Sequence, residues 1–296
     1  MRILNFGSMN LDYTYEVDHF VRPGETLSAL TQSLSPGGKG LNQSIALAKA
    51  GAMVHHAGCV GKGGEMLSGI LREAGVHTDL IREVPELQGN AVIQVTPSGE
   101  NCILLFGGSN RCITEAQIRE TLSIFSAGDT LLLQNEINLL PEIIDTASEK
   151  GLCIFLNPSP CDEKIRGMDL SGISWLLVNE IEAEQLTGET RPEKAWEFLH
   201  GKYPKLSLLV TLGKEGAAAF SGSEAVFQPA FPVAAVDTTA AGDTFTGYFI
   251  TALTEGLPLR ECLRRSAMAS AIAVTRPGAA KSIPWKQEVE QALDNL

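Results

Sequence analysis

Apolar runs of strand length alternate with segments of helical composition along most of the chain. Strands are predicted at 3–6, 54–60, 130–133, 153–156, 175–178, 206–211 and 233–236. Helices are predicted at 41–50, 65–74, 140–150, 181–186, 243–254, 259–274 and 285–293. Because strands separated by helices favour a parallel sheet covered on both faces, the predicted fold class is α/β, with a mostly parallel central sheet.

Two early regions depart from this rhythm, because their apolar and polar positions alternate with a period of two. They are 13–20 with 27–34, and 91–96 with 102–106. The Pro-Ser-Gly-Glu connection at 97–100 is typical of a hairpin. Such alternation indicates a sheet with one solvent-exposed face. We therefore expect a single α/β domain over 1–296 that carries a small β-sheet lid, formed by about 12–36 and 89–108.

The composition is that of a globular protein, since 44% of the 296 residues are hydrophobic and 20% are charged. A net charge of −12 repels a phosphate backbone and argues against nucleic acid as a partner. No apolar run is long enough to span a membrane, and the first residues turn polar too soon for a signal peptide, so we expect a cytoplasmic protein. The six cysteines form no C-x-x-C pair, which disfavours zinc and redox sites, and most are expected to be buried thiols.

The segment 237–245 combines small residues, a predicted helix start and an acid. Ala240, Ala241 and Gly242 have almost no side chain, so their N–H groups can face a ligand, and a helix N-terminus adds partial positive charge. This arrangement predicts an anion hole in which Asp243 takes a proton from an attacking hydroxyl group. Taken alone, an aspartate at this position is more often an N-cap.

A second Gly-rich stretch, residues 35–43, leads into the helix predicted at 41–50. Its glycines allow the backbone to approach a ligand closely, and Lys39 and Asn42 supply hydrogen-bond donors. Gly40 stands where a Walker A loop requires Ser or Thr, so this stretch is not a P-loop. A flexible turn explains it equally well.

Other polar residues follow further predicted strands. Asn10 and Asp12 lie two residues apart on an extended segment and could bind neighbouring hydroxyl groups of a ligand. Turn formation is the commoner role of such residues. Asn179 and Glu182 follow the strand at 175–178 and could orient Mg²⁺-bound water, or simply begin a helix. Residues 211–216 could line a nucleotide pocket or form a tight turn.

In their joint order these motifs resemble the ribokinase (PfkB-type carbohydrate kinase) family over essentially the whole chain. The most specific parts are the Gly-Gly-Lys-Gly stretch at 37–40 with Asn42, and the signature at 237–243. The segment 273–279 is similar to the same family. The resemblance implies a ribokinase-like fold with ATP, Mg²⁺ and an activating K⁺. Because the family's lid pairs between subunits, it also implies a homodimer through the lid.

Residue roles follow from the resemblance, position by position. The catalytic base falls on Asp243, within an anion hole at Ala240, Ala241 and Gly242. Sugar-binding positions fall on Asn10, Asp12, Gly38, Lys39, Asn42, Glu136 and Asp243. Nucleotide-site positions fall on Asn179, Thr211, Gly213, Gly216 and Gly242, to which we add Glu182 as the neighbour of Asn179. A monovalent-cation site, formed mostly by backbone carbonyls, falls on Asp237, Thr239, Ala273, Arg276, Gly278 and Ser282.

Three positions depart from the family pattern. Ala267 stands where many ribokinases carry Asn or His near the adenine, so that contact is lost or replaced. Pro277 replaces a frequent Lys in the cation loop, which changes the stiffness of the loop but keeps a carbonyl ligand. The Gly-Asn-Ala segment at 89–91 differs from the Thr-Gly-containing lid pattern, which affects the identity of the sugar.

The implied reaction is ATP-dependent phosphorylation of D-ribose to D-ribose 5-phosphate, with Asp243 as general base. The many polar residues at sugar-site positions favour ribose, because a polyhydroxylated ligand needs many hydrogen bonds. A related kinase for another sugar or a nucleoside remains an alternative, as does a non-catalytic sugar or nucleotide sensor. A Rossmann oxidoreductase is disfavoured, because no G-x-G-x-x-G follows the first strand.

Overall fold

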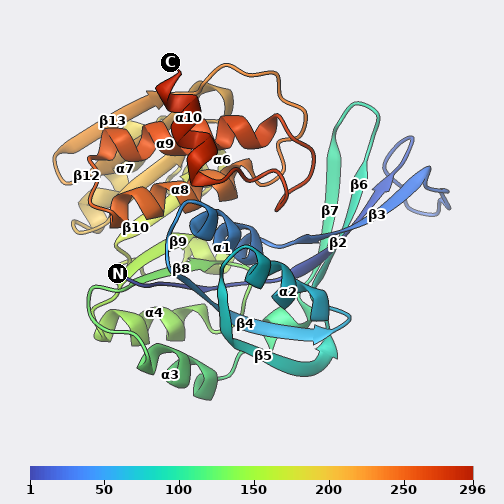
Figure 1. The fold of residues 1–296 in the computed structure, drawn as a ribbon, viewed down its shortest axis with the longest axis horizontal. Coiled ribbons are helices and arrows are strands. Elements are labelled where there is room, and N and C mark those ends of the chain that lie inside the picture. The colour runs from blue at the N-terminus through green and yellow to red at the C-terminus, as the bar shows by residue number, and fades with distance from the viewer. Residues whose placement is uncertain (296) are drawn as a thin grey trace.

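Nine strands form a large central sheet, and four further strands form a smaller sheet that projects from one end of the molecule (Figure 1). The computed structural model describes residues 1–295. The order across the large sheet is β13-β12-β11-β10-β9-β8-β1-β4-β5. The strands from β5 to β11 in this order are parallel, and β12 and β13 are antiparallel at one edge. The predicted fold class is therefore confirmed.

The bounds of the large-sheet strands match most of the predicted runs to within about two residues. They are β1 (Ile3–Phe6), β4 (Val54–Lys62), β5 (His77–Leu87), β8 (Thr130–Gln134), β9 (Cys153–Asn157), β10 (Trp175–Asn179), β11 (Ser207–Thr211), β12 (Gly216–Ser221) and β13 (Glu224–Pro229). Strands β1 and β8 are buried along their whole length, which explains why their sequences are almost continuously apolar.

Helices cover both faces of this sheet (Figure 1). The apolar core on one face includes residues of α1 (Lys39–Lys49), α2 (Glu65–Glu73), α8 (Ala241–Thr254), α9 (Leu259–Val274) and α10 (Lys286–Asp294). The core on the opposite face includes residues of α3 (Glu115–Ser123), α4 (Leu140–Glu149), α5 (Glu163–Arg166), α6 (Glu180–Thr187) and α7 (Pro192–Lys202). Along β8, Leu132 joins the first core while Leu131 and Leu133 join the second, as the alternation of strand side chains requires.

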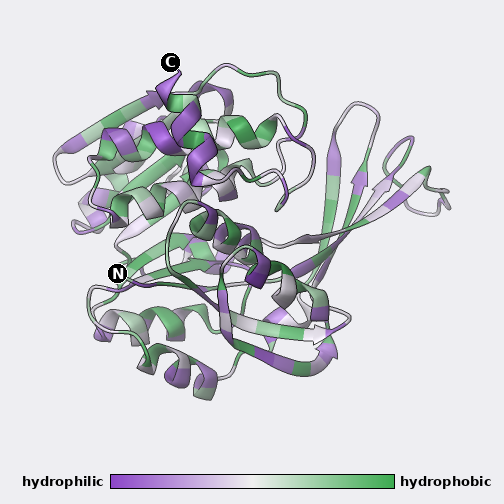
Figure 2. Cartoon of the chain, in the orientation of Figure 1, coloured by the Kyte–Doolittle hydropathy of each residue, from purple (hydrophilic) through white to green (hydrophobic). Residues whose placement is uncertain are grey.

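The small sheet occupies the predicted lid segments. Its strands are β2 (Asn10–Glu16), β3 (Thr31–Gly37), β6 (Asn90–Val95) and β7 (Asn101–Phe106), in the order β3-β2-β6-β7. Figure 2 shows hydrophobic and hydrophilic residues mixed along these strands. The expectation of a single solvent-exposed face is wrong for β7. Residues on both faces of this strand are exposed, including the apolar run 103–106.

Several local predictions were wrong or incomplete. Residues 233–236 form no strand, and the amide of Val236 instead donates to the carbonyl of Val274 at 2.7 Å. Helix α8 begins at Ala241, two residues earlier than predicted. Strands β5, β12 and β13 and helices α3, α5 and α7 were not predicted, nor were the short 3₁₀ helices Gly108–Arg111 and Gly213–Glu215.

Two further expectations concern thiols and membranes. Only Cys59 and Cys262 are buried, and Cys102 is exposed on β7, so the expectation that most cysteines are buried is wrong. Within residues 1–295, no helix combines the length and the apolar character needed to span a bilayer.

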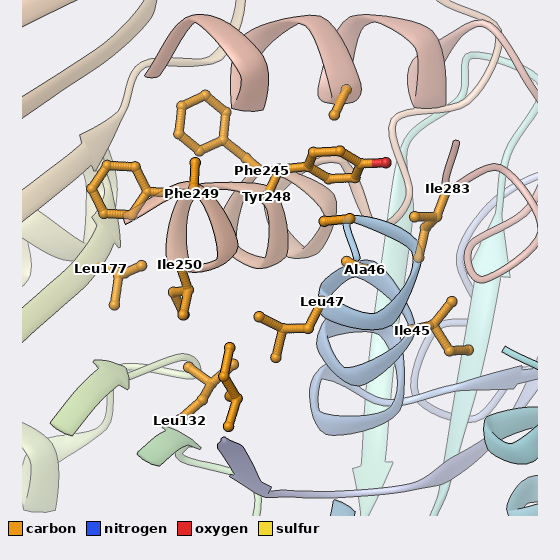
Figure 3. Close-up of a cluster of buried hydrophobic side chains, with 14 of the residues drawn as sticks. Ile45, Ala46, Leu47, Leu132, Leu177, Phe245, Tyr248, Phe249, Ile250 and Ile283 are labelled. Atoms are coloured by element: carbon orange, nitrogen blue, oxygen red, sulfur yellow. The ribbon is translucent and has the colours of Figure 1, made fainter. Parts of the chain in front are cut away.

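Helices α1 and α8 pack side by side, and this contact determines the position of the site described below (Figure 3). Phe245, Tyr248, Phe249 and Ile250 of α8 contribute to the core beside α1. The close approach depends on Gly247, because a Cβ atom there would lie 2.4 Å from the Cβ of Ala46 and 2.7 Å from the backbone nitrogen of Leu47.

Replacing Gly247 with alanine is therefore expected to destabilise the protein, even though alanine favours helices. Overpacking of this kind typically lowers the free energy of unfolding by about 1–3 kcal/mol, which a thermal-unfolding midpoint would detect. Gly69 in α2 is the matched control, since a Cβ atom there would meet nothing within 4 Å. Gly69→Ala should leave stability equal or raise it. Equal stability of the two variants would contradict the prediction.

Candidate active site

The carboxyl ends of several parallel strands meet the first turn of α8 at one edge of the large sheet. A cavity of about 350 Å³ lies there, between the ends of β9, β10 and β11 and residues 238–246. Ligands of open α/β sheets bind at this edge. Predicted site residues that line the cavity are Lys39, Asn179, Glu182, Thr211, Gly213, Ala240, Ala241, Gly242 and Asp243.

Asp243 lies within the first turn of α8 and is buried. Ala240 occupies the N-cap position, so the alternative that Asp243 is an N-cap is wrong. Both carboxylate oxygens accept hydrogen bonds from α1. The Nδ2 of Asn42 donates to Oδ2 at 3.1 Å, and the Nε2 of Gln43 donates to Oδ1 at 2.9 Å. The carboxylate is thus held in one orientation at the wall of the cavity.

The backbone ahead of Asp243 adopts an unusual conformation. Ala240 has φ 60°, in the left-handed region that non-glycine residues rarely adopt. The amide of Ala241 donates to the carbonyl of Thr238 at 3.2 Å, so this member of the predicted anion hole already has an acceptor. The amides of Gly242 and Asp243 are first-turn groups that have no intrahelical acceptor. They are the N–H groups of this turn that a bound anion can engage.

Glu136, which follows β8, contacts the Gly-rich stretch from the opposite side. Its carboxylate accepts hydrogen bonds from the Lys39 amide at 3.1 Å and from the hydroxyl group of Ser8. The amide of Gly40 donates to the Ser8 Oγ at 3.2 Å. A Cβ atom at Gly40 would lie 2.3 Å from the Ser8 nitrogen, so the glycine permits this packing. The first-turn amides of Lys39 and Gly40 are therefore satisfied by protein groups rather than left open for a phosphate.

The predicted lid-side sugar residues lie where the chain enters the small sheet at β2 and leaves it after β3. Asp12 packs over Gly37, whose Cβ atom would lie 1.8 Å from an Asp12 carboxylate oxygen. Gly38 has φ 90° and occupies the N-cap position of α1. Asn10 is buried, and its Oδ1 accepts a hydrogen bond from the Nδ2 of Asn110 at 2.7 Å, which leaves the Asn10 amide donors for other partners.

The unusual lid segment 89–91 has a structural reason. A Cβ atom at Gly89 would lie 2.2 Å from the Nδ2 of Asn110 and 2.8 Å from the Oδ1 of Asn10, so no larger residue fits against this pair. Ala91 lies opposite Asp12 in the pairing of β2 with β6.

A cluster of carboxylates surrounds Lys39. Burial alone would lower the pKa of the Lys39 ammonium group, but the charges of Asp243, Glu136 and Glu182 together raise it. Burial raises the pKa of Asp12 to about 7, and the charges of Glu136 and Asp243 add to the increase. Burial also raises the pKa of Glu136, against the opposing effect of Lys39. Lys39 therefore stays protonated near neutral pH, while Asp12 titrates in that range.

Asn179 and Glu182 form a capping box at the start of α6. The Asn179 Oδ1 accepts from the Glu182 amide at 2.8 Å, and the Glu182 Oε2 accepts from the Asn179 amide at 3.1 Å. The helix-start interpretation is therefore correct, and the same side chains line the cavity. One Glu182 carboxylate oxygen remains outside the capping box.

A second cavity, of about 430 Å³, adjoins the first along Thr211, Gly213 and Gly242. Gly216 lies in its wall and is required by the sheet, because a Cβ atom there would lie 2.0 Å from the carbonyl oxygen of Gln228. Ala267 also lines it. The neighbouring side chains are mostly apolar: Ala230, Phe231, Pro232, Val233, Ala235, Phe245, Ala271 and Val274.

Most of the residues predicted for a cation site lie on two loops that Asp237 joins. Its carboxylate accepts from the Thr239 amide at 2.9 Å and from the Gly278 amide at 2.8 Å. These hydrogen bonds lower the pKa of Asp237, although burial acts in the opposite direction. The Arg276 side chain pairs with Glu288. Ala273 lies in the last turn of α9. Ser282 is buried and donates to the Ala279 carbonyl at 2.8 Å.

Comparison with known proteins identifies the family. The family model described as pfkB family carbohydrate kinase matches residues 2–286. This chain belongs to that family. The ribokinase of Haemophilus influenzae is 36% identical over 299 residues, covering 98% of this chain and 97% of that protein. The structure of Cryptococcus neoformans ribokinase in complex with ADP matches with a TM-score of 0.87 and 32% identity over 98% of this chain and 99% of that one.

A third comparison bears on the substrates. The structure of Arabidopsis thaliana ribokinase complexed with ribose and ATP matches with a TM-score of 0.86 and 31% identity, over 98% of each chain. The recognised family, the ribokinase-like fold and the assignment as a sugar kinase are confirmed.

In this pfkB-family kinase, sequence reasoning missed several polar residues at the site, including three whose side chains bind predicted site residues. Ser8 binds Glu136, Gln43 binds Asp243, and Asn110 binds Asn10. Gln43 stands directly beside Asn42 in the motif, and its amide in an otherwise apolar helix face was a usable signal. Asn110 lies in a 3₁₀ helix beyond the lid, and nothing in its local sequence indicated a contact with a residue 100 positions earlier.

Proposed function

We propose that this protein transfers the γ-phosphoryl group of ATP to the 5-hydroxyl group of D-ribose, giving ADP and D-ribose 5-phosphate. The observation that carries the proposal is the position of the Asp243 carboxylate. It is buried on the first turn of α8 and hydrogen-bonded to Asn42 of α1. It also lines the cavity to which the ends of β10 and β11 contribute. A general base at that junction lies between the sugar-side and nucleotide-side residues.

The chemical step follows from these groups. Asp243 accepts the proton of the sugar's 5-hydroxyl group. At the same time the hydroxyl oxygen forms a bond to the γ-phosphorus, and the bond between the γ-phosphorus and the departing ADP oxygen breaks. The amides of Gly242 and Asp243 face the charge that develops on the transferred group, and the α8 N-terminus adds partial positive charge. Lys39 provides a full positive charge at the same cavity.

Sugar positioning is assigned to the polar residues on the lid side. Asp12 and Glu136 accept hydrogen bonds from hydroxyl groups, while Asn10 and Asn42 donate them, with Gly38 and Lys39 alongside. Holding the hydroxyl group in line with the phosphorus is much of what such an enzyme contributes. The apolar lining of the second cavity, including Ala267, supports burial of the nucleotide base there.

Mg²⁺ and K⁺ are part of the proposal. Mg²⁺ neutralises phosphate charge when bound, and Asn179 and Glu182 are the residues that would orient its water ligands. K⁺ would be held by carbonyl groups of the loops that Asp237 joins, through Asp237, Thr239, Ala273, Arg276, Gly278 and Ser282. The pairing of Arg276 with Glu288 supports this assignment, because it directs the guanidinium charge to Glu288.

The deciding test is an ADP-release assay with ATP, Mg²⁺ and D-ribose, run with K⁺ and with a large organic cation in its place. We expect ribose-dependent turnover that is faster with K⁺. A panel that adds 2-deoxyribose, other sugars and nucleosides separates the substrate from the mechanism. Faster turnover of another panel member would overturn the choice of ribose. Absence of turnover on every member would favour a sensor.

A homodimer through the lid is also proposed. It is supported by the apolar run Ile103, Leu104, Leu105 and Phe106 on β7, all of them exposed in the single chain. Leu104 is the most exposed of these at 71%. Light scattering is expected to give twice the 31.7 kDa mass of the chain, and Leu104→Lys should shift the protein towards monomer. A monomeric wild type would contradict the dimer.

A further inference from the structure

Gln43 makes a contact with the candidate base that no part of the proposed mechanism uses. Its side chain is fully buried on α1. The Nε2 donates to the Asp243 Oδ1 at 2.9 Å and to the Asn157 Oδ1 at 3.0 Å. Both amide hydrogens therefore have acceptors, and one of those acceptors is the carboxylate that faces the cavity.

The orientation of the Gln43 amide is determined from behind by a chain of buried groups. The Nε2 of Gln134 donates to the Gln43 Oε1 at 2.7 Å and to the Asn5 Oδ1 at 3.0 Å. The Asn5 Nδ2 donates in turn to the Gly40 carbonyl and to the Ser44 Oγ, each at 2.8 Å. Because the Gln43 oxygen already accepts a hydrogen bond, its NH₂ group must point towards Asp243.

We propose that Gln43 is a positioning residue for phosphoryl transfer, an inference that rests on the proposed function. Its amide holds the Asp243 carboxylate in the rotamer that reaches the sugar hydroxyl group. A hydrogen bond from an amide to a carboxylate is charge-assisted and is stronger than one between neutral groups. Misplacement of a catalytic group by about 1 Å can lower a rate on the order of 100-fold.

The loss of a positioning contact should change different kinetic constants from the loss of a purely structural contact. Asn42 donates to the other carboxylate oxygen of Asp243, so loss of Gln43 leaves the base attached on one side only. Sugar binding by Asp12 and Glu136 does not involve Gln43. The expected defect therefore lies in kcat and not in KM for the sugar.

Gln43→Met keeps the length of the side chain and removes both donors and the acceptor. We expect kcat to fall by about 10- to 100-fold, with KM for the sugar within about threefold of wild type.

The substitution leaves the neighbouring charged groups in place, because Lys39 on α1, Asp12 on β2 and Glu136 after β8 are not altered. The matched control is Gln117→Met, which removes another buried amide that donates to the Gly58 carbonyl at 2.9 Å on a different part of the sheet. It should lower the unfolding midpoint similarly while leaving kcat near that of wild type.

The assay uses the panel member that wild type phosphorylates fastest. A failure of the ribose assignment can therefore be distinguished from a failure of the positioning role of Gln43. A wild type that prefers another sugar overturns only the substrate. Gln43→Met with kcat within about twofold of wild type overturns the positioning role. An equal loss of kcat in Gln43→Met and Gln117→Met also overturns it, because the effect would then be structural.

Discussion

Asp243→Asn is expected to lower kcat by about 10²- to 10⁴-fold, the range that general base catalysis contributes. An asparagine cannot accept the proton of the sugar hydroxyl group. It also presents an NH₂ group to one of the two donors, Asn42 or Gln43, that now bind the carboxylate. Steady-state kinetics should show the loss mainly in kcat, since the amides of Gly242 and residue 243 remain available to the nucleotide.

Calorimetric titration with ADP distinguishes a lost base from a collapsed site, and affinity should remain within about tenfold of wild type. Asp129→Asn is the matched control, because Asp129 is a buried aspartate that pairs with Arg2 far from the cavity. Its kcat should stay near that of wild type. Turnover by Asp243→Asn within tenfold of wild type would assign the base to another group.

Asp12→Asn is expected to lower kcat/KM for the sugar by about 10- to 100-fold, since hydrogen bonds to charged groups contribute about 1.5–3 kcal/mol. In wild type, burial raises the pKa of Asp12 to about 7, with Glu136 and Asp243 adding to the increase. Only the carboxylate form accepts two hydroxyl donors, so KM should rise about tenfold from pH 8 to pH 6. The variant should lack this dependence. A flat wild-type profile would contradict the role of Asp12.

The same shift in pKa predicts the effect of pH on stability. The folded pKa of Asp12 is about 7, above the ordinary 3.8 of an unfolded chain, so folding favours the protonated form. The free energy of unfolding therefore declines as pH rises from about 4 to 7, and the full loss is present above 7. Asp12→Asn should raise the unfolding midpoint more at pH 8 than at pH 6. Asp18→Asn is the control, since Asp18 is exposed on the same lid segment.

The sequence by itself determined the class of fold and the residue types of the site. Apolar runs in β1, β8, β10 and β11 are continuous because those strands are buried on both faces, and that burial leaves a local signature. Glycines at 38 and 40 marked places where the backbone comes close to other groups. The small residues at 240–242 marked the turn at which α8 begins. These are properties of single segments, so periodicity and composition are sufficient to find them.

Other features were decided only by packing between distant segments. Residues 233–236 are as apolar as a strand, but Val236 bonds to the end of α9 and no strand pairs with them. Strand β7 alternates less strictly than predicted, and its exposure depends on its place at the edge of the lid. An edge and a central strand can have similar sequences, because the difference lies in their neighbours.

The site itself shows the same division. The sequence indicated Asp243 as an acid near a helix start, but it left open whether the residue was a cap or a base. The packing of α1 against α8, which Gly247 permits, brings Asn42 and Gln43 to its carboxylate from 200 positions away. Contacts of that kind depend on how two helices approach each other in space, so only the tertiary structure determines them.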